Sequence, residues 1–402
     1  MNQPPAALDN APLAHYKVLD LSQGVAGPYC AHLLSRQGAD VIKVDPPDGD
    51  WARHVGISRQ GQSSLSTTYN AGKRSIAVDA RQAEGRALLR RLAKGADIVI
   101  QNFRPKVVQR MGVDYDSLCA AGMDPVYVSI SGYGPTGPYA DRPATDSVMQ
   151  ADTGLMVTNC DAQGKPQRVG LLLADITMGV YAAQACTAAL LGKARDGKGR
   201  HVQLNLFEVC CALQSTVLAD HALRGDQPAE GVSAPNGVFA AADGYITLLA
   251  LNNDHFERLG RALDLPHWLQ DTRFASNTAR LAHKHVLHAE LDALIALQPR
   301  AYWEERLAAQ GALHASVRTL SDVVSHPQAE HLASFDTLEQ PGFGSLLYAA
   351  SPWSPLGAHP GTAPRIGEHT AQILADAGCT PQEIRQWMAS GVVQQSSEGT
   401  TT

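Results

Sequence analysis

The chain has 402 residues, which is long enough for two domains and a large buried core. Its 44% hydrophobic and 18% charged content is typical of a globular protein and excludes a disordered or fibrous one. The formal net charge of -6, with no long basic run, argues against nucleic acid as the main partner.

The amino terminus and the cysteines bear on location. The first ten residues, MNQPPAALDN, contain no basic region followed by an apolar stretch, so we expect no secretory signal. The least polar stretch, residues 169–192, is interrupted by polar residues, and we interpret it as a core element and not as a membrane span.

Seven cysteines without CxxC spacing predict reduced, buried thiols in a cytoplasmic protein. No HExxH or His/Cys cluster with ligand spacing occurs, so no metal site is predicted.

The first part of the chain alternates β-rich runs with helical patterns. The predicted strands are residues 16–21, 40–44, 75–78, 97–101 and 126–131, and the predicted helices follow the Gly27-Pro28 turn and span 83–93. Proline near the start of the first helix and Gly38 after its end are typical helix boundaries. The alternation predicts an α/β fold with a mainly parallel sheet covered on both faces, and a nucleotide-containing ligand at the carboxyl ends of its strands.

Two loops next to predicted strands carry basic residues, NAGKR at 70–74 and NFRPK at 102–106. A single basic side chain is most often a solvated surface charge. The recurrence of such residues at strand ends, where a polyphosphate would lie, favours phosphate contacts. The candidates are Arg53, Lys73, Arg74, Arg104, Lys106 and Arg110.

Two glycine-rich matches are set aside. Residues 132–137 (GYGPTG) fit GxGxxG after a predicted strand, but prolines interrupt the turn and no helical pattern opens there. Residues 192–199 nearly fit the P-loop, but glycine occupies the Ser/Thr place and the run ends a helix. We therefore predict neither a dinucleotide fingerprint nor a P-loop.

The second part of the chain contains a change of composition. A predicted strand at 201–206 and a helix at 207–222 are followed by Gly, Pro and small polar residues at 225–234, as in a linker. Further predicted elements are a strand at 245–250, helices at 256–263, 285–297, 370–377 and 381–390, a helix that ends near 313, and a disordered tail at 394–402. We predict a large domain at 1–224, a small domain at 225–330 and a C-terminal segment at 331–402 that returns to the large domain.

Asp175 is the one ionisable carboxylate of residues 169–192, and two interpretations are open. In the structural one, Asp175 is the N-cap or a first-turn residue of the helix that follows and stabilises that helix by about 1 kcal/mol. In the functional one, a carboxylate in apolar surroundings serves as a nucleophile or a base. The two are compatible, because a helix start would keep the carboxylate ionised.

Six segments carry a resemblance to a known family. They are VLDLSQGVAGPYCAHLLSRQGADVIKVDPPDGD, YNAGKRSIAVD, ADIVIQNFRP, ISGYGPTGPYADRPATDSVMQADTGL, LLLADITMGVYAAQACTAALL and IGEHTAQILADAGCTPQEI. In this order they resemble the family III coenzyme A transferases and their relatives, the 2-methylacyl-CoA racemases. The resemblance implies a Rossmann-like large domain, a smaller α+β domain, and a homodimer of interlocked rings.

The resemblance also implies the chemistry. Asp175 falls on the catalytic aspartate of the family, which attacks an acyl-CoA thioester to give a mixed anhydride and then an aspartyl-CoA thioester. The acceptor carboxylate attacks next, and CoA moves to the new acyl group. The implied partners are an acyl-CoA and a free carboxylic acid, with no permanently bound cofactor, no metal, no nucleic acid and no membrane.

The residues that match CoA contacts of the family lie in three segments. They are Val25, Ala26, Lys73, Asn102, Phe103 and Arg104. To these we add Arg110, which is a candidate from the basic residues described above. Val25 and Ala26 match a loop over the thioester, and some members carry a glutamine at the place of Val25. The loop of the smaller domain differs from the glycine run of formyl-CoA transferases, so formyl or oxalate specificity is not expected.

The racemase branch needs a titrating base, a histidine in a Gly-His-Asp segment. The matching residues here are Ala144, Thr145 and Asp146, and threonine is no base near neutral pH. We therefore favour the transferase, with Thr145 and Asp146 on the substrate side; Asp146 either orients the substrate or caps a helix. The alternatives are the racemase and a non-catalytic acyl-CoA binding protein, which would tolerate loss of Asp175.

Overall fold

The structure is a computed structural model that describes residues 11–161, 163–225, 227, 231–352 and 361–396. The chain divides into two compact units, one formed by residues 1–216 and 333–402 and the other by residues 217–332. The first of these divisions, after residue 216, lies within helix α9 (Ser215–Arg224). It is a few residues before the domain boundary at 224 that we predicted from the sequence. The predicted tail from 397 onwards lies outside the described residues.

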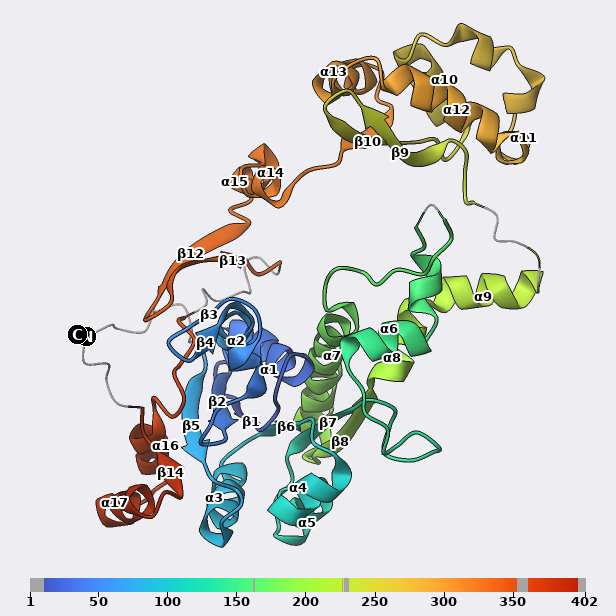
Figure 1. The fold of residues 1–402 in the computed structure, drawn as a ribbon. Coiled ribbons are helices and arrows are strands. Elements are labelled where there is room, and N and C mark those ends of the chain that lie inside the picture. Colours follow the sequence, from blue (N-terminus) through green and yellow to red (C-terminus); the bar gives the residue numbers. More distant parts are fainter. Residues whose placement is uncertain (1–10, 162, 226, 228–230, 353–360, 397–402) are drawn as a thin grey trace. The chain divides into compact units, whose positions relative to one another are not determined.

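A seven-stranded sheet forms the centre of the first unit (Figure 1). Its strands are β1 (Lys17–Asp20), β2 (Asp40–Asp45), β5 (Arg74–Val78), β6 (Ile98–Gln101), β7 (Val126–Ser131), β8 (Arg200–Asn205) and β14 (Val393–Gln394). The order is β14-β5-β2-β1-β6-β7-β8, and every neighbouring pair is parallel except β14 and β5. The six parallel strands follow the order of a doubly wound nucleotide-binding sheet, in which the order reverses between β1 and β6. The predicted α/β fold with a mainly parallel sheet is confirmed.

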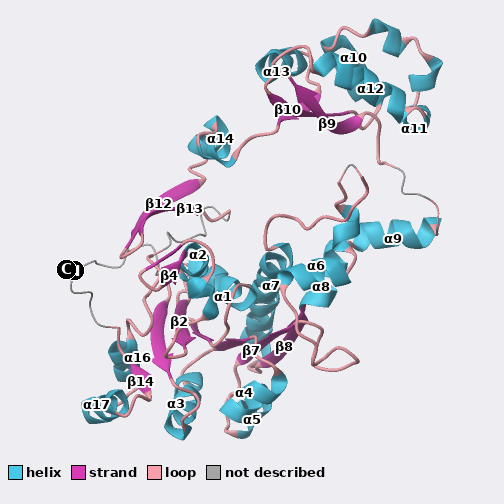
Figure 2. Ribbon diagram, viewed as in Figure 1, coloured by secondary structure: helices cyan, strands magenta, loops and turns pink. Residues whose placement is uncertain are grey.

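Helices cover both faces of this sheet (Figure 2). They are α1 (Ala26–Arg36), α3 (Ala83–Lys94), α4 (Pro105–Met111), α5 (Tyr115–Ala120), α6 (Asp146–Asp152), α7 (Leu173–Asp196), α8 (Leu206–Leu213), α16 (Thr370–Asp376) and α17 (Pro381–Ala389). Helix α2 (Ser64–Asn70) packs against α1. Two short hairpins, β3 (Ser58–Arg59) with β4 (Gln62–Ser63) and β12 (Phe335–Gln340) with β13 (Gly344–Ala349), complete the unit. Short 3-10 helices are η1 (Trp51–His54) and η2 (Leu155–Thr158).

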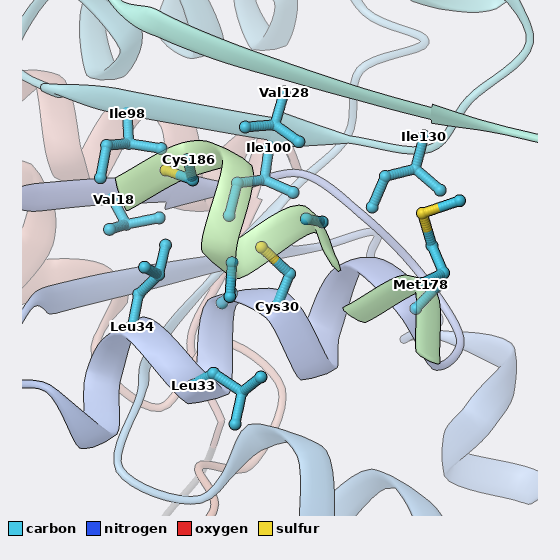
Figure 3. Close-up of a cluster of buried hydrophobic side chains, with 14 of the residues drawn as sticks. Val18, Cys30, Leu33, Leu34, Ile98, Ile100, Val128, Ile130, Met178 and Cys186 are labelled. Atoms are coloured by element: carbon cyan, nitrogen blue, oxygen red, sulfur yellow. The ribbon is translucent and has the colours of Figure 1, made fainter. Parts of the chain in front are cut away.

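Alternate side chains of each central strand enter different cores, as the two-residue period of a strand requires. Val18 of β1 packs toward α1 and α7, whereas Leu19 packs toward α3 and the C-terminal helices. Figure 3 shows the first of these cores, where Ile98 and Ile100 face Cys30 of α1 and Cys186 of α7. A strand that is buried on both faces has apolar side chains at consecutive positions. This explains the apolar run Ile-Val-Ile at residues 98–100.

Helices α1 and α7 approach each other closely at Gly179. A Cβ on Gly179 would lie 2.7 Å from Cδ1 of Tyr29 and 3.1 Å from the carbonyl oxygen of Ala26. Only glycine therefore allows the first turns of α7 to pack on the start of α1. This contact brings Asp175, in the first turn of α7, near Val25, the N-cap of α1.

Three segments differ from the sequence expectations. The single helix predicted for 207–222 is two helices, α8 and α9, bent by 68° where the Gln214 side chain donates to the carbonyl oxygens of Cys210 and Thr153. The hairpin of β12 and β13, which turns at residues 340–344, was not predicted. Helix α2 was not predicted because its sequence is polar; Ser63 and Ser66 form a capping box at its start.

The second unit has its own core. An antiparallel sheet of β9 (Asn236–Ala241), β10 (Gly244–Leu249) and β11 (Leu313–Ser316) packs on helices around the stacked rings of Phe256 and Trp268. Its further helices are α10 (Asn253–Ala262), α11 (Asn277–Ala282), α12 (Lys284–Ile295), α13 (Arg300–Ala309), α14 (Leu320–Val324) and α15 (Pro327–His331), with 3-10 turns η3 (Pro266–Leu269) and η4 (Thr272–Phe274). This is the α+β composition expected for the smaller part.

Among the described residues, no single helix has both the length and the apolar composition to cross a membrane. The bent pair of α8 and α9 meets that criterion when the two helices are taken together.

Gly85 tests the packing of α3 on the loop before it. A Cβ on Gly85 would overlap the carbonyl oxygen of Asp79, so Gly85→Ala should lower the free energy of unfolding by about 1–3 kcal/mol, although alanine is the better helix former. The matched control is Gly95→Ala, because the nearest atom to a Cβ there is 3.6 Å away. Urea unfolding followed by circular dichroism measures both; equal stability of the two variants would contradict this account.

Candidate active site

A cavity of about 280 Å³ opens at the carboxyl ends of β1, β6 and β7. It is lined by Gln23, Val25, Ala26, Trp51, Asn102, Phe103, Ile130, Ser131, Gly132, Ala144, Thr145, Asp175 and Leu206. Six residues predicted as site residues are therefore brought together, from the start of α1, the end of β6, the start of α6 and the start of α7. The cavity lies beside the reversal of strand order, where a doubly wound sheet binds its ligand.

Asp175 is the third residue of α7 and is half-buried. Burial raises the pKa of its carboxyl from 3.8 to about 7, and the charge of Asp146 adds to the increase. Burial thus outweighs the helix start, and with this pKa the carboxyl is only partly ionised near neutral pH. A carboxyl with this pKa in a cavity is a candidate for covalent or acid–base chemistry.

Thr145 and Asp146 have different roles at the start of α6. The Oγ1 atom of Thr145 accepts a hydrogen bond from the N–H of Val148 and caps α6, and Thr145 also lines the cavity. Asp146 is 3% exposed and does not line it. Its Oδ1 atom accepts a 2.7 Å bond from the N–H of Ala174, so of the two roles predicted for Asp146 the structure supports capping, and the helix that it caps is α7.

The loop from Gln23 to Val25 is held from two sides. Asn102 accepts a 2.9 Å bond from the N–H of Gln23 and donates a 2.7 Å bond to its carbonyl oxygen. Both carboxylate oxygens of Asp50 accept from the N–H of Gly24, and a side chain at Gly24 would collide with Trp51. The predicted contact residue Asn102 therefore acts on the loop that forms one cavity wall.

A second cavity, of about 490 Å³, adjoins the first. It is lined by Leu21, Gln23, Val44, Asp45, Pro46, Pro47, Asp48, Val78, Asp79, Ala80, Arg81, Arg86, Leu89, Phe103, Val107, Arg110 and Met111. Phe103 and Gln23 line both cavities, and Arg110 supplies an exposed guanidinium to the larger one. The larger cavity combines apolar walls with three arginines and three aspartates, whereas Asp175 is the one charged residue that lines the smaller cavity.

Lys73 and Arg104 do not line either cavity. The Lys73 ammonium is fully buried and donates to the Asp20 carboxylate at 2.7 Å and to the Pro28 and Asn70 oxygens at 2.9 Å. All three of its protons are used, so the structure gives Lys73 a structural role and no free donor for a phosphate. Burial lowers its pKa to about 8 in spite of Asp20. Arg104 is the exposed N-cap residue of α4.

Sequence reasoning did not single out several residues of the smaller cavity. They are Gln23, Trp51, Ile130, Ser131, Gly132 and Leu206. Ser131 and Leu206 end the predicted strands 126–131 and 201–206, and Gly132 directly follows the first of these strands. Their position at strand ends is the sequence signal that could have identified them. Gly132 has a further reason, because a Cβ there would collide with Ala144.

Within the part of the chain that the structure describes, no group of three or more His, Cys, Asp and Glu side chains is arranged to hold a metal ion. The seven cysteines are free thiols. Cys30, Cys186, Cys210 and Cys379 are buried, but Cys119 and Cys160 are exposed, which corrects the prediction that all seven are buried.

Comparison with known proteins gives consistent matches. Residues 13–370 match the family described as CoA-transferase family III. The succinate–glutarate CoA-transferase of Agrobacterium fabrum is 32% identical over 388 residues, 91% of this chain and 95% of that protein. The succinyl-CoA:glutarate CoA-transferase of Homo sapiens is 30% identical over 397 residues, 96% and 90% of the two chains. The crystal structure of a CAIB/BAIF family protein from Brucella suis is 33% identical, with a TM-score of 0.82 over 92% of this chain and all of that one.

These matches span most of the chain, and the relatives are named as CoA-transferases. The chain is therefore an enzyme of the CoA-transferase family III, as its sequence segments predicted.

Proposed function

We propose that the enzyme moves CoA from an acyl-CoA to a free carboxylic acid by double displacement, with Asp175 as the nucleophile. The observation that carries the proposal is the Asp175 carboxyl itself, half-buried in a cavity whose other lining side chains are uncharged. Poor solvation makes a carboxylate a stronger nucleophile than it is in water.

The first half of the reaction uses the donor. The Asp175 carboxylate attacks the thioester carbonyl carbon, the C–S bond breaks, and CoA thiolate leaves a mixed anhydride on the enzyme. The thiolate then attacks the aspartyl carbonyl of that anhydride and expels the donor carboxylate, which gives an aspartyl-CoA thioester.

The second half repeats these steps with the acceptor. Its carboxylate attacks the aspartyl-CoA carbonyl and expels CoA thiolate, and the thiolate attacks the acceptor carbonyl of the new anhydride. The acceptor leaves as acyl-CoA, and the Asp175 carboxylate is regenerated. No proton or electron is gained or lost, and holding the reacting groups together supplies much of the rate.

The substrate is proposed to extend across both cavities. The nucleotide would occupy the larger one beside Arg110, and the thioester would lie in the smaller one against Val25 and Ala26. The N-cap residue of α1, Val25, provides no side-chain cap, so we propose that the N–H groups of Ala26 and Gly27 bind the developing oxyanion.

Two features bear on the alternatives. A racemase needs a base opposite Asp175 on the α6 side, and Thr145 there uses its Oγ1 atom to cap α6. A protein that only binds acyl-CoA would gain nothing from a buried carboxyl with a raised pKa, which costs folding free energy.

We also propose that the enzyme is a homodimer in the cytoplasm. Large apolar side chains are exposed on α7 and α8, among them Leu191 at 74% and Leu213 at 45% exposure. Exposed apolar groups concentrated on neighbouring helices favour coverage by a second chain. Seven free thiols suit a reducing compartment.

Replacement of the nucleophile is the direct test. Asp175→Asn and Asp175→Ala should abolish CoA exchange between an acyl-CoA and a carboxylic acid, because no acyl adduct can form, while CoA still binds. Exchange is followed by mass spectrometry of the thioesters, and intact-mass analysis of wild-type enzyme during turnover should find an adduct that hydroxylamine removes. Retained exchange in either variant, or an adduct on another residue, would refute the mechanism.

The raised pKa of Asp175 also predicts a stability effect. The folded protein keeps a proton on this carboxyl up to about pH 7, whereas the unfolded chain releases it near pH 4. The stability contributed by Asp175 therefore falls as pH rises from about 4 to 7 and stays low above that.

Asp175→Asn removes this pH-dependent cost, so it should raise the thermal midpoint more at pH 8 than at pH 4. Asp161→Asn is the control, because backbone N–H groups lower the pKa of that exposed carboxyl and its effect should have the opposite sign. Scanning calorimetry at both pH values measures the difference; an Asp175→Asn effect that is independent of pH would contradict the raised pKa.

Arg110 tests where the nucleotide lies. Arg110→Ala should weaken CoA binding about 2- to 5-fold, as expected for loss of one exposed ion pair. Lys106→Ala is the matched control, since Lys106 is exposed one turn away on α4 but does not line the larger cavity. Turnover of an acyl-pantetheine, which lacks the nucleotide, should be equal in wild type and Arg110→Ala. An equal loss with acyl-pantetheine would place the effect of Arg110 elsewhere.

A further inference from the structure

Two buried polar side chains of α6 face the segment that leads into α7. Asp146 is 3% exposed and Gln150 is fully buried. Gln150 accepts a 2.9 Å bond from the N–H of Val169 and donates a 3.3 Å bond to the carbonyl oxygen of Leu171. It also donates a 2.7 Å bond to the Oδ2 atom of Asp146.

Asp146 completes the connection to α7. Its Oδ1 atom accepts from the N–H of Ala174 at 2.7 Å and from that of Asp175 at 3.5 Å. The N-cap residue of α7, Leu172, has no side chain able to accept such bonds. The first turn of α7, which carries Asp175, is thus capped by a residue 28 positions earlier in the chain.

The donors and acceptors leave one choice of residue at position 146. The backbone of Val169 and Leu171 fixes the orientation of the Gln150 amide, so its NH₂ group must point at residue 146. The backbone N–H of Ala174 points at the same side chain. Residue 146 must accept on both sides, which an ionised carboxylate does and an asparagine does not.

Other titratable groups near Asp175 are neutral. Tyr69 of α2 and Cys210 of α8 interact with its charge, and burial raises their pKa values to about 12 and about 11. Asp146 is the charge that acts on Asp175 among the described residues.

We propose that Asp146, oriented by Gln150, is a positioning residue that fixes the first turn of α7 and, through its charge, favours the uncharged acylated form of Asp175 over the free carboxylate. The inference rests on the proposed nucleophilic role of Asp175. Acylation removes the negative charge of Asp175, so it relieves repulsion from Asp146 and makes both attack and adduct formation more favourable. Asp146 itself touches no substrate.

Asp146→Asn is the first variant of the test. It removes the charge and turns an NH₂ group toward another donor, so the protonation midpoint of Asp175 should fall and kcat should decrease about 10- to 100-fold, with KM for acyl-CoA little changed. The midpoint is read from the infrared carboxyl band that disappears in Asp175→Asn. Intact-mass analysis measures the acylated fraction at steady state, which should also fall.

The double variant Asp146→Asn with Gln150→Glu provides the rescue. It returns one negative charge to α6 and keeps a donor–acceptor pair between positions 146 and 150, with loss of the 3.3 Å bond to the Leu171 carbonyl oxygen, so it should recover part of kcat and raise the midpoint again. Asp152→Asn is the control on the same helix, because Asp152 accepts from Tyr133 and pairs with Arg142. It should leave both readouts unchanged.

The outcomes separate this inference from the proposed function. A wild-type midpoint and wild-type kcat in Asp146→Asn would overturn the role of Asp146. A shifted midpoint in Asp146→Asn together with retained exchange in Asp175→Ala would refute the nucleophile and leave the electrostatic link intact. If Asp146→Asn fails to fold, the double variant decides: its failure to fold or to recover kcat overturns the inference.

Discussion

The close packing of α1 on α7 is the constraint on which the site depends. Both helices start at the carboxyl edge of the sheet, and the absence of a side chain at Gly179 lets the start of α7 reach Ala26 and Tyr29. The beginnings of two helices therefore meet at one cavity. One brings a first turn whose N-cap residue, Val25, provides no side-chain cap, and the other brings the Asp175 carboxyl. In the proposed mechanism these two groups are the hydrogen-bond donor and the nucleophile of the transfer.

Buried ion pairs support the loop between β1 and α1. Asp20 pairs with Lys73 at 2.7 Å, and Lys43 pairs with Asp50 at 3.3 Å, all with side chains that are almost completely buried. Such pairs contribute little net stability, because desolvation offsets their attraction, but loss of one partner leaves a costly buried charge. Here the pairs have a positional effect: Asp50 also binds the N–H of Gly24, and so joins the pairs to the cavity wall.

Much of the fold and part of the site followed from the sequence. Apolar runs buried on two faces identified the parallel strands, and the apolar stretch around Asp175 correctly indicated a first-turn carboxyl. Ion pairs between residues far apart in the sequence could not be predicted. Lys73 lies next to a strand, as a phosphate ligand would, and only the structure shows that it pairs with Asp20, 53 residues earlier. The cap that Asp146 provides for α7 was equally invisible, because a helix cap is normally sought next to the helix.

The wall shared by the two cavities has a consequence for the order of events. Gln23 and Phe103 border both spaces, so in the proposed binding mode one wall contacts both the CoA part of the substrate and the acyl group that reacts. In that mode CoA stays bound throughout a cycle, and only the carboxylic acids exchange. Binding energy from CoA then serves both halves of the reaction without a second binding step.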